Sequence, residues 1–73
     1  MAHVSRSQFE SAANHREFED LYDAAVEAIA NDPANAHLSD READDLGVGT
    51  VDKFLEDAGL VARREALRSE ALR

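Results

Sequence analysis

The sequence contains no cysteine and no tryptophan, and it has one proline and three glycines. Without cysteine, the chain has neither a disulfide framework nor a thiolate metal site to strengthen a small core. No apolar run approaches the roughly 20 residues that cross a bilayer. The stretch MAHVSRSQFE at the start lacks the apolar segment of a signal peptide. We therefore expect a cytoplasmic protein or a virion component, with no membrane partner.

Basic residues are also scarce. Sixteen acidic residues stand against eight basic ones, and only one of the eight is a lysine, so the formal net charge is −8. Such an excess of carboxylates repels nucleic acid and anionic membranes, and it destabilises a compact chain unless salt screens it. The composition is typical of proteins from salt-loving cytoplasms, and a GC-rich genome would account for it equally well. The charge is uneven, because residues 62–73 carry four arginines and two glutamates.

Capping signals predict where the helices begin and end. A serine or asparagine followed three residues later by glutamate occurs at Ser7, Asn14 and Ser39, and each can open a capping box. Pro33 predicts the end of a helix because its ring cannot continue one. Gly59 predicts a left-handed helix end, with the next residue folding back onto the helix. No alternating strand pattern occurs anywhere in the chain.

These signals predict an all-α fold, a small bundle of four to five short helices containing a helix-turn-helix-like pair. One helical domain should cover residues 8–73, after a flexible N-terminal tail over residues 1–7. The core is predicted to consist of Phe18, Leu21, Tyr22, Ala25, Val26, Ile29, Leu46, Val48, Val51, Phe54, Leu55, Leu60 and Leu67.

The position of Phe9 depends on whether the first helical segment bends. Phe18 belongs to an apolar stripe on one side of its helix. Phe9 lies nine residues earlier, so one straight helix would turn it about 180° away from that stripe. Either the chain bends near Asn14, which we favour, or Phe9 is exposed and available to a partner.

Residues 38–61 resemble a helix-turn-helix. The resemblance implies a short helix that ends at Leu46–Gly47, a sharp turn, and a second helix capped by Thr50. Regulators of that family usually place about three residues between an LGV tripeptide and a TV dipeptide. Here these are residues 46–48 and 50–51, and Gly49 is the single residue between them. The shorter turn rotates the second helix by about 200°, so groove-facing side chains are not carried over. The residues that carry the resemblance are Ala43, Leu46, Gly47, Val48, Thr50, Val51 and Leu55.

Charge argues against DNA reading by this pair. The would-be recognition helix offers Lys53 against three carboxylates, whereas contacts from Arg and Lys to phosphate supply most of a DNA reader's affinity. The stretch also resembles a helix-hairpin-helix, but its Leu46 directly abuts the first glycine, where that motif leaves a residue between them. We therefore interpret the pair as a packing motif, with turn and packing residues Ala43, Gly47, Val48, Gly49, Thr50, Val51 and Gly59.

The sequence does not group the residue types that bind metals or act as catalysts. His3, His15 and His37 do not share the spacing of a metal site. The acids that begin at Asp40 imitate a calcium loop but lack its glycine at the sixth position and its glutamate at the twelfth. Serine and threonine are best explained as helix caps, with no histidine nearby in any catalytic pattern. We therefore expect no enzyme, no cofactor and no bound metal.

These observations favour a non-catalytic protein–protein interaction or assembly module, a small subunit of a homo-oligomer or of a larger complex such as a virion. A chain of this length buries only roughly 60% of its unfolded surface, so association would supply missing burial. The predicted contact residues are Phe9, Arg63, Arg64, Arg68 and Arg73. One alternative is a helix-turn-helix-type nucleic-acid-binding regulator, which the charge disfavours. The second is an acidic mimic of nucleic acid that sequesters a basic protein.

Overall fold

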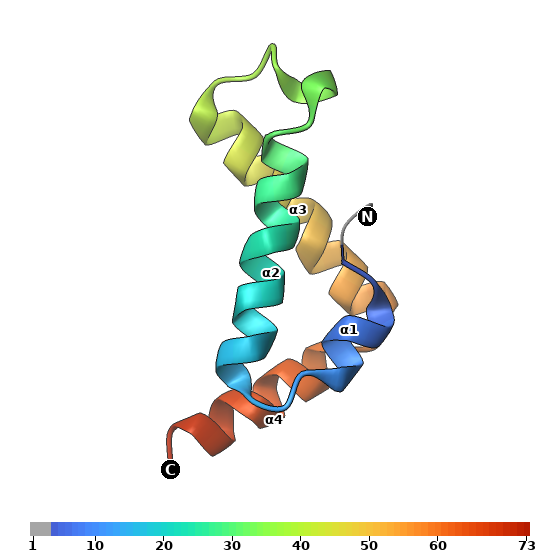
Figure 1. The fold of residues 1–73 in the computed structure, drawn as a ribbon, viewed down its shortest axis with the longest axis vertical. Helices are drawn as coiled ribbons and strands as arrows, with labels where there is room; N and C mark the ends of the chain where they lie inside the picture. Colours follow the sequence, from blue (N-terminus) through green and yellow to red (C-terminus); the bar gives the residue numbers. More distant parts are fainter. Residues whose placement is uncertain (1–3) are drawn as a thin grey trace.

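The structure, a computed structural model, describes residues 4–73, and this part of the chain is helical without any strand. The all-α bundle predicted from the sequence is confirmed. The antiparallel helices α2 and α3 form the long axis of the molecule, and α1 and α4 lie across the end opposite the α2–α3 loop (Figure 1). The elements are α1 (Arg6–Ser11), α2 (His15–Ala30), the short 3₁₀ helix η1 (Pro33–Asn35), α3 (Asp40–Asp57) and α4 (Val61–Ala71).

The first helix begins two residues earlier than predicted. Ser5, not Ser7, is its N-cap: the Ser5 hydroxyl accepts from the Gln8 N–H, and the Gln8 side chain accepts from the Ser5 N–H at 2.8 Å. Glutamine closes a capping box as well as glutamate does, which is why the box forms here. Val4 is buried in the core. The predicted flexible tail is therefore wrong from Val4 onward, and residues 1–3 lie outside the described residues.

The bend near Asn14 is confirmed. Helix α1 ends at Ser11, and α2 begins at His15 after Asn14 has capped it by accepting the Glu17 N–H at 2.9 Å. The bend turns Phe9 inward, where its side chain is fully buried. The prediction that Phe9 is a contact residue for a partner is therefore wrong, because the core already covers it.

Helix α3 continues through the predicted turn. Residues 40–57 form one helix, so the predicted helix end at Leu46–Gly47 and the new start at Thr50 are wrong. A glycine inside a helix costs only about 1 kcal/mol, which tertiary packing readily overrides. The packing here comes from one face of α3, where buried residues recur every fourth position at Ala43, Gly47, Val51 and Leu55. The turn that a helix-turn-helix requires is thus absent from residues 46–50.

Gly47 serves close helix packing. A Cβ built on Gly47 would lie 2.7 Å from the backbone oxygen of Val26, so α2 and α3 approach more closely than an alanine at this position allows. Gly49 has no atom within 4 Å of its would-be Cβ and lies on the exposed side of the helix. Neither glycine therefore forms a turn. Thr50 is likewise exposed within the helix and is not its cap.

The end of α3 is the one predicted from its glycine. Gly59 adopts a left-handed conformation with φ of 73°. Its N–H donates to the Glu56 carbonyl at 3.1 Å, and the Leu60 N–H donates to the Leu55 carbonyl at 2.9 Å. This pair of bonds is the Schellman motif, which folds the apolar residue after the glycine back into the core.

The core excludes the predicted Leu46 and includes four residues that were not predicted, namely Val4, Phe9, Ala12 and Ala43. Leu46 is 42% exposed, so its assignment to the core is wrong, because a continuous helix turns it about 100° away from Gly47. Phe9 takes a central place, with its ring centroid 4.9 Å from that of Phe18 and 6.2 Å from that of Phe54. The buried core residues are Val4, Phe9, Ala12, Phe18, Ala25, Val26, Ala43, Val51, Leu55, Leu60 and Leu67. Those packed against them are Leu21, Tyr22, Ile29, Val48, Phe54 and Ala58.

Candidate functional site

The first of the predicted contact arginines, Arg63, is used within the chain. Its Nη2 lies 2.6 Å from the Ala12 carbonyl oxygen, and its Nε lies 3.4 Å from the carbonyl oxygen of Phe9. Carbonyl groups at the C-terminus of a helix lack intrahelical partners, and a cationic side chain stabilises them. Arg63 therefore holds α1 on α4, which places it in the fold of the domain.

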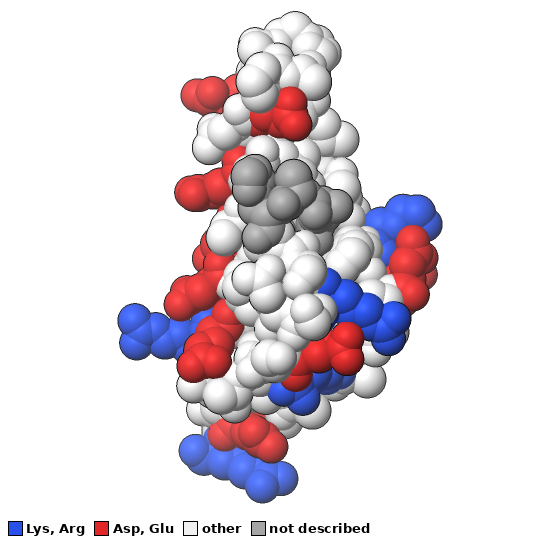
Figure 2. All heavy atoms as spheres, turned by 45° about the vertical axis from the view of Figure 1, so that its right-hand side comes forward, with Lys and Arg blue, Asp and Glu red and all other residues white. Residues whose placement is uncertain are grey.

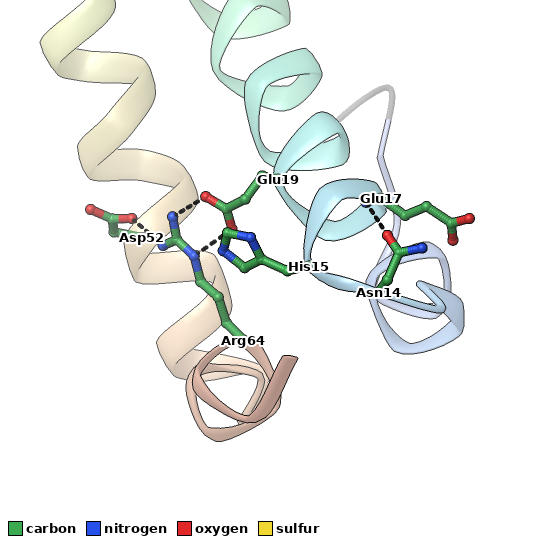
Figure 3. Close-up of polar contacts among 6 residues, drawn as sticks. All are labelled: Asn14, His15, Glu17, Glu19, Asp52 and Arg64. Carbon is green, nitrogen blue, oxygen red and sulfur yellow. Dashed lines mark hydrogen bonds and ion pairs between the residues drawn. The ribbon is translucent and has the colours of Figure 1, made fainter. Parts of the chain in front are cut away.

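Arg64 is also engaged, in a polar cluster that joins α2, α3 and α4 (Figure 3). Its guanidinium makes two bonds to Glu19, Nε to Oε2 at 2.8 Å and Nη2 to Oε1 at 2.7 Å. It also lies 4.4 Å from the centre of the Tyr22 ring and 3.8 Å from Asp52. Two parallel bonds between arginine and carboxylate are the most directional form of ion pair. His15 Nε2 lies 3.8 Å from Glu19 Oε2. We call the residues His15, Glu19, Tyr22, Asp52 and Arg64 the Arg64 cluster.

The ion pair of the Arg64 cluster joins α4 to α2. The hydrogen bond from Arg64 is the main reason why the pKa of Glu19 is lowered, and partial burial opposes that effect. The same bond raises the pKa of Arg64. General acid–base catalysis needs a group whose pKa lies near the working pH. Because Glu19 and Arg64 both stay charged at neutral pH, the pair is suited to holding α4 against α2.

Tyr22 gives this cluster a clean spectroscopic reporter. Its hydroxyl donates to Asp52 at 2.7 Å, and partial burial, followed by this bond and the Asp52 charge, raises its pKa to about 12. Because Tyr22 is the only tyrosine and tryptophan is absent, tyrosinate absorbance reports this one group. We expect the folded protein to titrate near pH 12, against an ordinary value of 10.0. Asp52→Asn should lower the midpoint.

The linkage to stability has a definite sign. A pKa that is raised in the folded state means that the contribution of Tyr22 is complete below pH 10.0 and is lost as the pH rises towards 12. A midpoint near 10 in a protein whose circular dichroism still shows helix would contradict the Tyr22–Asp52 bond.

The remaining two predicted arginines are exposed. Arg68 is an exposed residue of α4, and Arg73 lies just beyond the end of that helix. Arg68 lines a polar hollow of about 390 Å³ with His15, Glu19, Arg64 and Glu65. The two carboxylates offset the cations there, so the hollow has no marked preference for an anion.

Within residues 4–73 no group of three or more histidine, aspartate or glutamate side chains is arranged to hold a metal ion. No helix in that range combines the length and apolar character needed to span a bilayer. The surface that stands out is an apolar hollow on the outer flank of α3.

We call this surface the α3 groove. It is an open groove of about 530 Å³, on a side of α3 that does not face α2. Leu46 supplies exposed apolar surface, Phe54 is half-buried at the base, and Gly49 leaves room because it has no side chain. Its lining residues are Asp45, Leu46, Gly49, Thr50, Lys53, Phe54 and Asp57.

Sequence reasoning missed the α3 groove because it assumed a turn inside it. The sequence predicts that Leu46 lies in the core, that Gly49 lies in the turn between two helices, and that Thr50 caps the second helix. The signal that could have found the groove is the spacing of Leu46, Thr50 and Phe54, which recur every fourth residue. That spacing forms a stripe only if residues 40–57 are a single helix.

The surroundings of the α3 groove are acidic. Residues 15–57 hold thirteen acidic and three basic residues, a net charge of −10. On the face that Figure 2 shows, the end of the molecule at the α2–α3 loop carries carboxylates and no basic side chain. Helical spacing places a ridge of exposed carboxylates on the outer side of α2, at Asp20, Asp23 and Glu27, and α3 adds the exposed carboxylates of Asp45 and Glu56.

No family model matches this chain, and the searches of curated proteins and of solved structures found no match. Two surfaces of residues 4–73 stand out, the apolar α3 groove and the exposed side of α4.

Proposed function

We propose that this chain is a non-catalytic protein-binding or assembly module, and that the α3 groove is its binding surface. The observation that carries the proposal is the exposed apolar surface of Leu46 beside Phe54, in a small domain where most large apolar side chains are covered. Exposed apolar hollows rimmed by polar groups mark protein-interaction sites. Cover by a partner would remove this surface from water.

The occupant that fits is an amphipathic helix with apolar residues on one side and lysine or arginine beside them. The groove follows α3 from Asp45 to Asp57, about 18 Å at the rise of an α-helix, and a helix lying in a groove is a recurring mode of peptide recognition. Lys53 pairs with Asp57 at 3.6 Å, but both side chains are largely exposed, so this pair holds its charges only weakly. The excess of carboxylates around the groove favours a cationic partner.

The two alternatives would use other surfaces. A nucleic-acid-binding regulator needs cations against phosphate, and residues 50–59 contribute Lys53 alone. An acidic mimic of nucleic acid would use the carboxylate ridge of Asp20, Asp23 and Glu27, which requires no apolar contact. That ridge makes the mimic the second candidate.

A nuclear magnetic resonance titration separates these functions. The probe is a synthetic amphipathic helix of leucine and lysine, long enough to cover the groove, with a leucine–glutamate peptide of the same pattern as its control. We expect the lysine peptide to shift the amide signals of residues 45–57. Leu46→Ser should weaken binding about threefold to tenfold, because fully burying a leucine contributes roughly 1.5–3 kcal/mol and a partner would bury only the 42% of Leu46 that is still exposed. Leu72→Ser removes an exposed leucine outside the groove and should leave the affinity unchanged.

The other outcomes would contradict the proposal. Signals that move only around Asp20, Asp23 and Glu27, with equal binding by wild type and Leu46→Ser, would favour the acidic mimic. Absence of peptide binding, together with retention of duplex DNA that Lys53→Glu abolishes, would favour the regulator.

A further inference from the structure

A second exposed stripe runs along α4, centred about 130° around the helix from the buried Leu67. It contains Val61 and Leu72, which are 47% and 78% exposed and are two of the three large apolar side chains exposed among residues 4–73. Glu65 and Arg68 lie between them and are exposed too. At 100° per residue, the four positions fall within an arc of about 60°. We call Val61, Glu65, Arg68 and Leu72 the α4 stripe.

The order of residues in the α4 stripe is complementary to itself. If two copies of α4 are laid antiparallel about a two-fold axis, Val61 of each copy faces Leu72 of the other. In the same register, Glu65 of each copy faces Arg68 of the other. A two-fold contact requires that each residue pair occur twice with the copies exchanged, and the spacing of these four residues satisfies that condition. We propose that the α4 stripe is a homodimer contact, in which a second copy of this chain docks antiparallel on α4.

The charges of the stripe are available for such a contact. The ion pairs formed among residues 4–73 include neither Glu65 nor Arg68. Arg64, by contrast, is bonded to Glu19 in the Arg64 cluster, and this ion pair fixes α4 against α2. The stripe therefore presents two apolar ends and two opposite charges on a helix whose orientation is already set. In an antiparallel second copy these four residues run in the opposite direction, so each of them lies opposite a complementary residue.

The contact is small. The α4 stripe is about 16 Å long, so the buried area falls below that of stable complexes, and the dimer should be weak. The α4 stripe and the α3 groove share no residue. The dimer therefore does not rest on the proposed function, and Leu46→Ser should leave it unchanged.

Charge reversal tests the register by analytical ultracentrifugation at one ionic strength. Glu65→Arg places arginine opposite Arg68 in both symmetric contacts, and Arg68→Glu places glutamate opposite Glu65 in both. Because like charges placed opposite each other are strongly unfavourable, we expect each single variant to raise the Kd about tenfold or more. The double variant Glu65→Arg, Arg68→Glu restores opposite charges and should dimerise like the wild type.

An equimolar mixture of the two single variants is the sharpest arm of the experiment. Each copy of Glu65→Arg then faces two glutamates on Arg68→Glu, so the heterodimer in the mixture should form more tightly than the homodimer of either variant. All three variants exchange good helix formers at exposed positions, and circular dichroism should confirm that they fold. The inference is overturned by a wild type that stays monomeric up to its solubility limit, by single variants that dimerise as the wild type does, or by a mixture that stays monomeric.

Discussion

Phe9→Ala should lower the free energy of unfolding by about 3–5 kcal/mol, the usual cost of removing a buried phenylalanine ring. Phe9 has no exposed surface, and its ring packs against Phe18 and Phe54. Tilted aromatic pairs of this kind add about 0.5–1.5 kcal/mol each beyond the area that they bury. The loss would therefore open the core between α1, α2 and α3.

The loss is large compared with the stability of so small a domain. At roughly 0.05–0.15 kcal/mol per residue, a chain of this length has only about 4–11 kcal/mol to lose. We expect Phe9→Ala to be largely unfolded or to unfold at a much lower urea concentration, as measured by far-ultraviolet circular dichroism. Phe9→Leu keeps most of the apolar volume and should remain folded, which allows a graded comparison.

Leu46→Ala is the matched control. The change removes most of the leucine side chain. Because Leu46 is 42% exposed, the free energy of unfolding should fall by less than about 1 kcal/mol. This order is the reverse of the one that the sequence predicts, in which Leu46 belongs to the core and Phe9 to a contact surface. A cost for Leu46→Ala equal to that for Phe9→Ala would mean that α3 is broken near residue 47.

Gly47→Ala and Gly49→Ala should change stability in opposite directions. Alanine is the better helix former by about 1 kcal/mol, so an unobstructed substitution in the middle of α3 stabilises the protein. Gly49 meets that condition, because nothing lies within 4 Å of its would-be Cβ. At Gly47 the new methyl would meet the Val26 backbone oxygen at 2.7 Å, and a backbone atom yields only if a whole helix moves. Overpacking of this kind typically costs about 1–3 kcal/mol, which exceeds the gain in helix propensity.

Thermal unfolding checks this pair directly. In a domain of this size, 1 kcal/mol corresponds to a shift in Tm of about 4–8 °C, so the two variants should differ by several degrees and have opposite signs relative to the wild type. A rise in Tm for both variants would mean that α2 and α3 are farther apart than the structure has them. A fall in Tm for both variants would mean that α3 is interrupted by the turn that the helix-turn-helix resemblance implies.

The helix ends that the sequence predicts correctly are those decided by neighbouring residues. Ser39 and Glu42 form the predicted capping box, with reciprocal bonds of 3.0 and 3.2 Å, and the Ser39 backbone bond is the main cause of the lowered pKa of Glu42. Pro33 follows the end of α2, and Gly59 ends α3. Each of these features depends on contacts across only three to five residues, so it can be read without knowledge of the fold.

The candidate surfaces could not be predicted in the same way. The α3 groove exists because α3 is continuous, and α3 is continuous because its inner face packs on α2. Likewise, two of the predicted contact arginines bond residues that are distant in the sequence, which makes them part of the fold. Arg63 bonds Ala12, 51 residues away, and Arg64 bonds Glu19, 45 residues away. A scan of local pattern has no access to such pairs.

By itself, the sequence determined the helical class, the acidic surface and the helix ends marked by Asn14, Ser39 and Gly59, because composition and short-range hydrogen bonds suffice for these. Only the tertiary structure decided whether Gly47 marks a turn or a close contact, and whether Phe9 is a surface or a core residue. The physical reason is that a cap contributes about 1 kcal/mol, whereas burial against a distant helix contributes several. Where the two compete within one segment, as in residues 43–55, packing prevails.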